Sequence, residues 1–226
     1  MNHRLTAIFQ LIRSDVGVID VGTDHGYIPT ALAQSGYAGN IFASDIHEEP
    51  LNAARRTAAE AGVQDRIAFS LCDGLAECPP DAVDCIIIAG MGGDMIVKIL
   101  DEAEWSMDPR YQLVLQPMTK AEVVRYWLAN NEYAIEQETL VDDAGTLYQI
   151  IVARFDGVCR LSDAELFVGK KALHNDKALY GRLLEEMIRR FEKMVIGMAE
   201  GESVGNSRYV LAVDIWNQLR ELKEKA

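Results

Sequence analysis

The sequence predicts an α/β fold with a mostly parallel sheet, followed by a pair of long helices. Short apolar runs alternate with amphipathic helical segments over the first two thirds of the chain. Such runs are typical of strands that are buried on both faces of a parallel sheet. From Ser162 onward, the apolar spacing is helical only.

The predicted elements follow one another in a regular order. A leading helix is expected over residues 2–13. Buried strands are expected over 16–21, 40–45, 66–71, 83–89 and 111–116, and helices over 27–35, 48–62, 94–104 and 120–130. Pro117 is expected to stop the fifth strand. Two further strands, 133–141 and 147–155, flank a hairpin signal at Asp142–Thr146.

The C-terminal part shows two helical stripes separated by a turn at 201–205. The stripes place apolar residues three or four positions apart, which predicts an antiparallel helical hairpin. They consist of Leu179, Leu183, Met187, Phe191, Met194 and Met198, and then Tyr209, Val213, Trp216, Leu219 and Leu222.

The composition is that of a globular protein of 226 residues, with 49% hydrophobic and 25% charged residues. No run of 18 apolar residues predicts a membrane span, and the N-terminus has no apolar core typical of a signal peptide. The four cysteines form no C-x-x-C pair, and no Cys/His cluster predicts a metal site. We therefore expect reduced thiols, no metal and a cytoplasmic location.

The net charge of −13 is unevenly distributed. Residues 1–155 hold 10 Lys+Arg and 23 Asp+Glu, whereas residues 156–226 hold 12 of each. Arg189 and Arg190 belong to a locally basic tail, and Arg4 lies in the leading helix. These cations are candidates for binding a polyanion, although on charge alone a solvated amphipathic face is the better explanation of the tail.

The turn after the first strand carries the main binding signal. Gly22 and Gly26 give the spacing G-x-x-x-G rather than the dinucleotide pattern, and Asp20 precedes the first glycine by two positions. A carboxylate there would repel a pyrophosphate but would attract the sulfonium and amino group of S-adenosyl-L-methionine (SAM). The alternative is a tight turn whose glycines serve chain reversal only.

Further candidates stand at the ends of the other strands, which share one edge of a parallel sheet. Asp45 can accept hydrogen bonds from ribose hydroxyls, and Asp73 can accept one from an adenine amine. Each could instead be a turn or cap residue. His25 is a candidate cofactor contact or a turn histidine. The predicted cofactor-binding residues are Asp20, Gly22, Thr23, His25, Gly26, Asp45, Ile46, Asp73, Gly74, Ala89 and Gly90.

Four segments together resemble the bacterial tRNA (adenine(22)-N1)-methyltransferases: 20–29 (DVGTDHGYIP), 72–75 (CDGL), 89–93 (AGMGG) and 115–117 (LQP). The resemblance covers essentially the whole chain. Met118 departs from it, since the family often has Asn there. The element order is also that of the Rossmann-like, seven-stranded class I methyltransferase sheet, in which one strand of the hairpin is antiparallel.

The resemblance implies transfer of the SAM methyl group to N1 of an adenine in tRNA, with a C-terminal coiled-coil-like hairpin. An acceptor for the adenine amine would orient the base, and the candidates are Asp24, Gln116 and a backbone carbonyl in 89–92, where Gly90 is the preferred residue. Tyr27 is either a contact or a core aromatic, and Gly92 and Gly93 either admit the base or open the next helix. The predicted substrate-binding residues are Arg4, Tyr27, Met91, Gly92, Gly93, Pro117, Arg189 and Arg190.

Two units follow from this interpretation: a catalytic domain over 1–158 and a helical hairpin over 159–226 that docks tRNA. The oligomeric state is expected to be a monomer or a weak homodimer. The main rival is a SAM-dependent methyltransferase acting on a small molecule or a protein, which leaves the hairpin without a role. A non-catalytic SAM- or RNA-binding module and an NAD enzyme are weaker alternatives.

Overall fold

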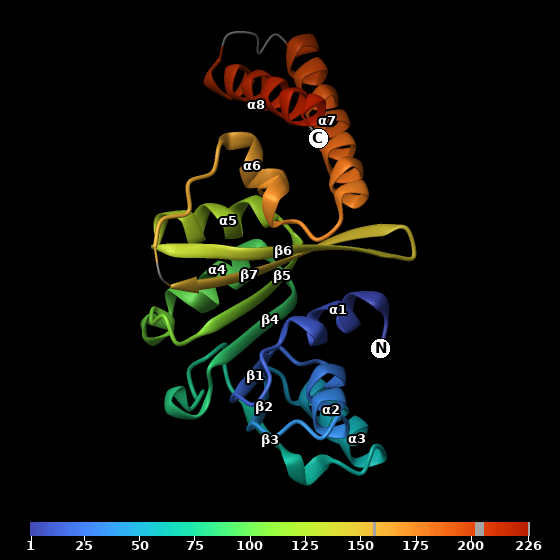
Figure 1. Ribbon diagram of the computed structural model, residues 1–226, viewed down its shortest axis with the longest axis vertical. Helices are drawn as coiled ribbons and strands as arrows, with labels where there is room; N and C mark the ends of the chain where they lie inside the picture. Colours follow the sequence, from blue (N-terminus) through green and yellow to red (C-terminus); the bar gives the residue numbers. More distant parts are fainter. Residues whose placement is uncertain (156, 202–205, 226) are drawn as a thin grey trace.

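A seven-stranded sheet forms the centre of the molecule (Figure 1). The computed structural model describes residues 1–155, 157–201 and 206–225. The strand order is β3-β2-β1-β4-β5-β7-β6, and β7 alone runs antiparallel to its neighbours. This confirms the predicted fold class. The strands are β1 Val18–Val21, β2 Ile41–Asp45, β3 Ile67–Leu71, β4 Cys85–Gly92, β5 Gln112–Thr119, β6 Tyr133–Asp143 and β7 Thr146–Phe155.

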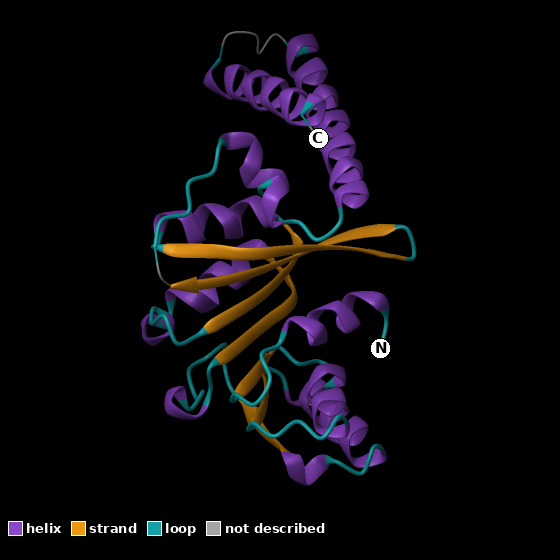
Figure 2. Ribbon diagram, in the orientation of Figure 1, coloured by secondary structure: helices purple, strands orange, loops and turns teal. Residues whose placement is uncertain are grey.

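Helices cover both faces of the sheet (Figure 2). On one face, α1 (His3–Leu11), α2 (Tyr27–Gln34) and α3 (Glu48–Glu60) bury apolar residues against the strands. On the other face, α4 (Gly93–Asp101) and α5 (Ala121–Asn130) do the same. Short 3-10 turns lie at Gln64–Arg66, Pro80–Ala82, Glu104–Ser106 and Lys171–Leu173. The strands are therefore buried on both sides, as their apolar runs predict.

The C-terminal helices form a separate layer with its own core. They are α6 Asp163–Val168, α7 Lys177–Glu200 and α8 Ser207–Glu224. The two predicted stripes meet in this core, which confirms the helical hairpin. Figure 1 shows α7 and α8, here called the arm, at one end of the molecule. Of the predicted turn, Gly201 caps α7, and 202–205 lie outside the described residues.

A buried ion pair lies where α5 and α6 meet the sheet. Arg125 of α5 and Glu138 of β6 pair while both are almost fully buried. Arg125 also donates to the carbonyl of Leu166 in α6 at 2.9 Å and to Gln149 Oε1 at 2.7 Å. A Cβ at Gly169 would collide with the carboxylate of Glu138, so the chain after α6 passes directly over the pair. We call Arg125, Glu138, Gln149 and the Leu166 carbonyl the joint.

Strands β4 and β5 extend further than predicted. Pro117 does not stop β5, which continues to Thr119. The pairing of β5 with β7 ends at Leu115, and beyond it β5 pairs only with β4. Pro117 therefore occupies an edge-like position, where a missing N–H is tolerated. The predicted glycine-rich loop after Ala89 is likewise strand, with an irregular register from Ala89 to Gly92.

The connection between β6 and β7 is tighter than the five residues predicted. Only Ala144 and Gly145 lie between the strands, and both have positive φ, 52° and 86°. Positive φ at both central residues is the geometry of a two-residue hairpin loop that matches the strand twist. The hairpin therefore projects as a long ribbon beside α1 and α7 (Figure 1).

Candidate functional site

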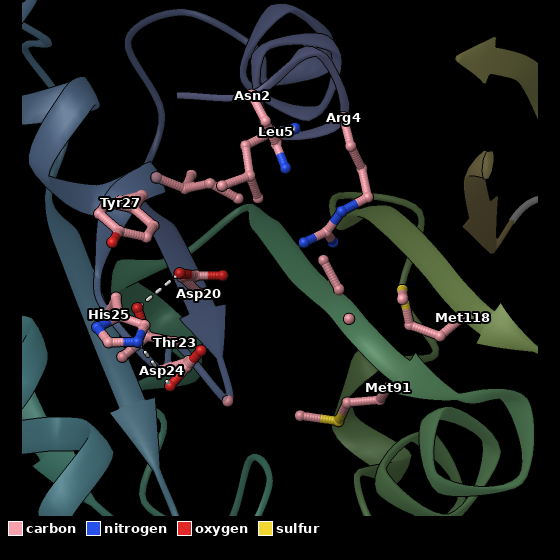
Figure 3. Close-up of a pocket in the computed structure, with 14 residues that line it drawn as sticks. Asn2, Arg4, Leu5, Asp20, Thr23, Asp24, His25, Tyr27, Met91 and Met118 are labelled. Atoms are coloured by element: carbon pink, nitrogen blue, oxygen red, sulfur yellow. Dashed lines mark hydrogen bonds and ion pairs between the residues drawn. The ribbon is translucent and has the colours of Figure 1, made fainter. Parts of the chain in front are cut away.

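A cavity of about 400 Å³ lies at the carboxyl ends of β1 and β4, with α1 above it (Figure 3). Its walls come from α1, the turn after β1, the start of α2, and the ends of β4 and β5. The lining residues are Asn2, Arg4, Leu5, Asp20, Gly22, Thr23, Asp24, His25, Tyr27, Ile28, Ala89, Gly90, Met91 and Met118. This volume is in the range of small-molecule sites, roughly 300–1,000 Å³.

The two glycines of the turn after β1 have different roles. Gly22 has a φ of +67°, and a Cβ there would strike the end of the Met91 side chain across the cavity. Gly26 has a φ of +66°, but its missing Cβ faces Ala54 of α3 at 2.7 Å. Gly22 therefore keeps the cavity open, whereas Gly26 lets α2 approach α3 and does not line the cavity.

Asp20 is the buried charge of the site. It is 5% exposed, and Thr23 Oγ1 donates to its Oδ2 at 2.7 Å. The pKa of Asp20 is raised from 3.8 to about 7, chiefly by burial and in smaller part by the charge of Asp45, although the Thr23 hydrogen bond lowers it. A cationic group in the cavity would stabilise the ionised form.

Besides Gly26, four predicted cofactor residues lie outside the cavity: Asp45, Ile46, Asp73 and Gly74. Asp45 accepts from the backbone N–H groups of His47 at 2.9 Å and Asp24 at 3.3 Å, so it ties the turns after β1 and β2 together. Ile46 and Asp73 are exposed beyond the strand ends. A Cβ at Gly74 would press on Ile99, which makes this glycine a packing position against α4.

Gln116 is fully buried and does not line the cavity. Its Oε1 accepts from Arg4 Nη1 at 2.6 Å and from the N–H of Gly90 at 3.2 Å. Its Nε2 donates to the Pro117 carbonyl at 2.9 Å. Gln116 therefore holds Gly90, which is exposed in the cavity wall with a φ of +81°.

Three exposed side chains form the outer rim of the site. The rings of His25 and Tyr27 stack with centroids 5.5 Å apart, and His25 Nε2 lies 3.9 Å from Asp24 Oδ1. Tyr27 is 47% exposed, so it is not a core aromatic. Figure 3 shows these side chains opposite Met91 and Met118.

The remaining predicted substrate residues are spread over three places. Arg4 and Met91 line the cavity. Gly92 caps α4 and Gly93 begins it, and a Cβ at Gly93 would collide with the Lys120 carbonyl. These two glycines therefore open the helix, as the simpler interpretation predicts. Pro117 lines a neighbouring groove, and Arg189 and Arg190 lie on α7 in the arm.

Helix α1 contributes more to the cavity wall than the predicted Arg4, because Asn2 and Leu5 line it as well. Asn2 caps this helix by accepting from the Leu5 N–H at 2.9 Å, and both residues line the cavity with Ile28 and Met118. The apolar stripe of the leading helix signals burial but not which surface it covers. Among the described residues, no group of three or more His, Cys, Asp or Glu could hold a metal ion. The four cysteines are free. Within the described ranges, no helix is long and apolar enough to span a bilayer.

Comparison with known proteins places this geometry in a family. Residues 1–151 match the family described as a methyltransferase domain. The tRNA (adenine(22)-N(1))-methyltransferase of Bacillus subtilis is 30% identical over 153 residues, which cover 68% of this chain and 64% of that protein. A candidate tRNA (m1A22) methyltransferase of Streptococcus pneumoniae, crystallised with SAM, has a TM-score of 0.82 at 27% identity. That likeness covers 97% of this chain and 98% of the S. pneumoniae chain.

A second solved structure supports the same fold over the whole chain. A protein of the NADB-Rossmann superfamily from Streptococcus agalactiae has a TM-score of 0.87 at 25% identity, covering 99% of this chain and 97% of that one. The structural likeness thus includes the arm, whereas the chain spans only 64% of the B. subtilis relative by sequence. The resemblance predicted from the motifs is confirmed: the chain belongs to the methyltransferase domain family, and tRNA methyltransferases are among its relatives.

Proposed function

We propose that this chain transfers the methyl group of SAM to N1 of adenine 22 in tRNA. One observation carries the proposal: a single cavity combines the buried carboxylate of Asp20 with the exposed backbone of Gly90. The first suits the cationic amino group of SAM, and the second offers a carbonyl for the amine of an adenine. The names of the B. subtilis and S. pneumoniae relatives support this substrate.

The residues present fit SAM. Asp20 provides a buried carboxylate for a cationic group, Gly22 leaves room for a close approach, and Thr23 holds Asp20 in place. Asp45 fixes the turn that carries Asp24, and we assign its carboxylate to accept from the ribose hydroxyls. When bound, SAM supplies an electrophilic methyl group.

The protein is asked mainly to position the adenine, since N1 carries a lone pair and needs no strong base. We assign the backbone at Gly90, with Asp24 as the alternative, to accept a hydrogen bond from the adenine amine. Gln116 acts indirectly, because its side chain holds Gly90 in position. Tyr27 and Met91 provide apolar surface on opposite sides of the cavity for a flat base (Figure 3).

We assign residues 1–158 to catalysis and 159–226 to tRNA docking. The excess negative charge belongs to the first unit, and phosphate neutralisation dominates affinity for nucleic acids. Arg189 and Arg190 are exposed on α7 and are the proposed phosphate contacts. We further propose a cytoplasmic protein that is a monomer or a weak homodimer.

Mass spectrometry of tRNA nucleosides after incubation with SAM tests the proposal. We expect 1-methyladenosine to appear in unmodified tRNA and the mark to map to position 22. Methylation of another base would overturn the site, and SAM turnover without tRNA methylation would favour a small-molecule or protein substrate.

A further inference from the structure

A second hollow, here called the side groove, lies beside the cavity. It has a volume of about 220 Å³ and runs between the end of β5, the β6–β7 hairpin, α6 and α7. Its surface mixes polar and apolar side chains and includes two aromatic rings and one arginine. The residues that matter here are Pro117, Met118, Tyr148, Phe167, Met187 and Arg190.

The side groove and the cavity share a wall. Met118 is 46% exposed and lines both hollows. Arg4 lines the cavity, and its guanidinium lies 5.6 Å from the ring centroid of Tyr148, which lines the groove. Gln116 holds Arg4 in place by a 2.6 Å hydrogen bond. The Arg4 guanidinium and the Tyr148 ring therefore form a fixed wall between the cavity and the groove. The cavity and the side groove are therefore neighbours on either side of Met118.

The cations around the groove differ in their availability. Lys120 is paired with Asp94, and Arg189 Nη1 lies 3.9 Å from Glu185 Oε2. Among the described residues, Arg190 forms no ion pair. It lines the side groove and also a second, shallow pocket formed by residues 186–194 of α7. Glu122 also lines the groove, on the side of α5, so an anion is favoured only on the α7 side.

We propose that the side groove holds the nucleotide adjacent to the methylated adenine, with its base on Tyr148 and its phosphate at Arg190. The inference rests on the proposed function, because it requires an adenine in the cavity. A groove that offers the ring of Tyr148 and, at Arg190, an arginine without an ion pair among the described residues matches a flat base linked to a phosphate. Unpaired bases are commonly bound by such stacking. The groove thus takes a neighbour that has left the RNA stack together with the target.

The test compares paired substitutions in the full chain. Removing a stacking ring costs roughly 5- to 150-fold in affinity. Tyr148→Ala should therefore weaken tRNA binding by this factor, whereas Tyr148→Phe should retain nearly all of it. Arg190→Ala should reduce the salt dependence of tRNA binding by about one ion. Arg189→Ala, its neighbour on α7, should change it less. SAM affinity, measured by calorimetry, should stay within twofold for all four variants.

A cycle that combines protein and RNA changes locates the base. Transcripts that lack the base on the 5′ or the 3′ side of the target adenine are bound by the native chain and by Tyr148→Ala. For one of the two transcripts, the loss of affinity from the missing base and the loss from Tyr148→Ala should not add, because both changes remove the same stacking contact. Additive losses for both transcripts would overturn the groove assignment, as would native-like binding by Tyr148→Ala. If the native chain neither binds nor methylates tRNA, the proposed function fails and this inference fails with it.

Discussion

Replacing Asp20 with Asn should stabilise the protein and impair its binding site. The folded chain holds a proton on Asp20 up to about pH 7, whereas the unfolded chain releases it near 3.8. Between these values, the folded state binds more protons, so the free energy of unfolding falls as the pH rises. Between the two pKa values, each pH unit lowers the free energy of unfolding by about 1.4 kcal/mol. Above pH 7, the ionised carboxylate therefore destabilises the folded chain by about 4 kcal/mol.

Asp20→Asn removes this cost because an amide cannot ionise. At pH 8, we expect its free energy of unfolding to exceed that of the native chain by up to about 4 kcal/mol. Near pH 4, the two proteins should be equal. SAM affinity should fall roughly 10- to 150-fold, the value of one charge-assisted hydrogen bond. The gain in stability and the loss of SAM affinity therefore both result from removing the charge of the Asp20 carboxylate.

Urea unfolding at pH 4 and pH 8, with calorimetric titration of SAM at pH 8, measures both effects. Asp24→Asn is the matched control for stability, because Asp24 lines the same cavity but its side chain is 71% exposed. Its stability should match the native value at both pH values. A stability difference for Asp20→Asn that is the same at pH 4 and pH 8 would refute the reasoning, and so would unchanged SAM affinity.

Three further outcomes follow from the hydrogen bonds. Asp45→Ala unties the turns after β1 and β2, so SAM affinity should fall roughly 10-fold or more in calorimetry; unchanged binding would show that the tie is dispensable. Gln116→Ala frees Gly90 and Arg4, so kcat for tRNA methylation should fall while SAM affinity stays within twofold; an unchanged kcat would contradict the positioning role. Glu138→Gln leaves Arg125 buried without a counterion, which should lower the free energy of unfolding by about 3–5 kcal/mol in urea; a loss below 1 kcal/mol would argue against an ionised pair.

The parts of the site that are local in sequence could be predicted. The apolar run before Gly22 requires a buried strand, and parallel strands present their carboxyl ends at one edge. That reasoning places Asp20, Gly22 and Gly90 together, as the structure does. The order of strands and helices is equally local, since it depends on the length and period of each segment.

The parts that depend on tertiary packing could not be predicted. Gly26 and Gly74 look like ligand positions in sequence, but their missing Cβ atoms face Ala54 and Ile99. Pro117 can remain in a strand only because β7 stops pairing two residues earlier. Arg125 follows the polar pattern of an exposed helix residue, and nothing in that pattern reveals the carboxylate that meets it inside the protein.

The joint has a consequence for how a large substrate must fit. Lifting α6, which packs in one core with the arm, away from the sheet would break the hydrogen bond from Arg125 to the Leu166 carbonyl and uncover the buried pair. We therefore expect α6, and the arm that packs against it, to keep their place on the sheet when RNA binds. A tRNA that spans the arm and the cavity must supply the deformation itself, and molecules that bend or unstack easily at the target are favoured. The enzyme then selects RNA that deforms easily and does not change its own shape to fit the RNA.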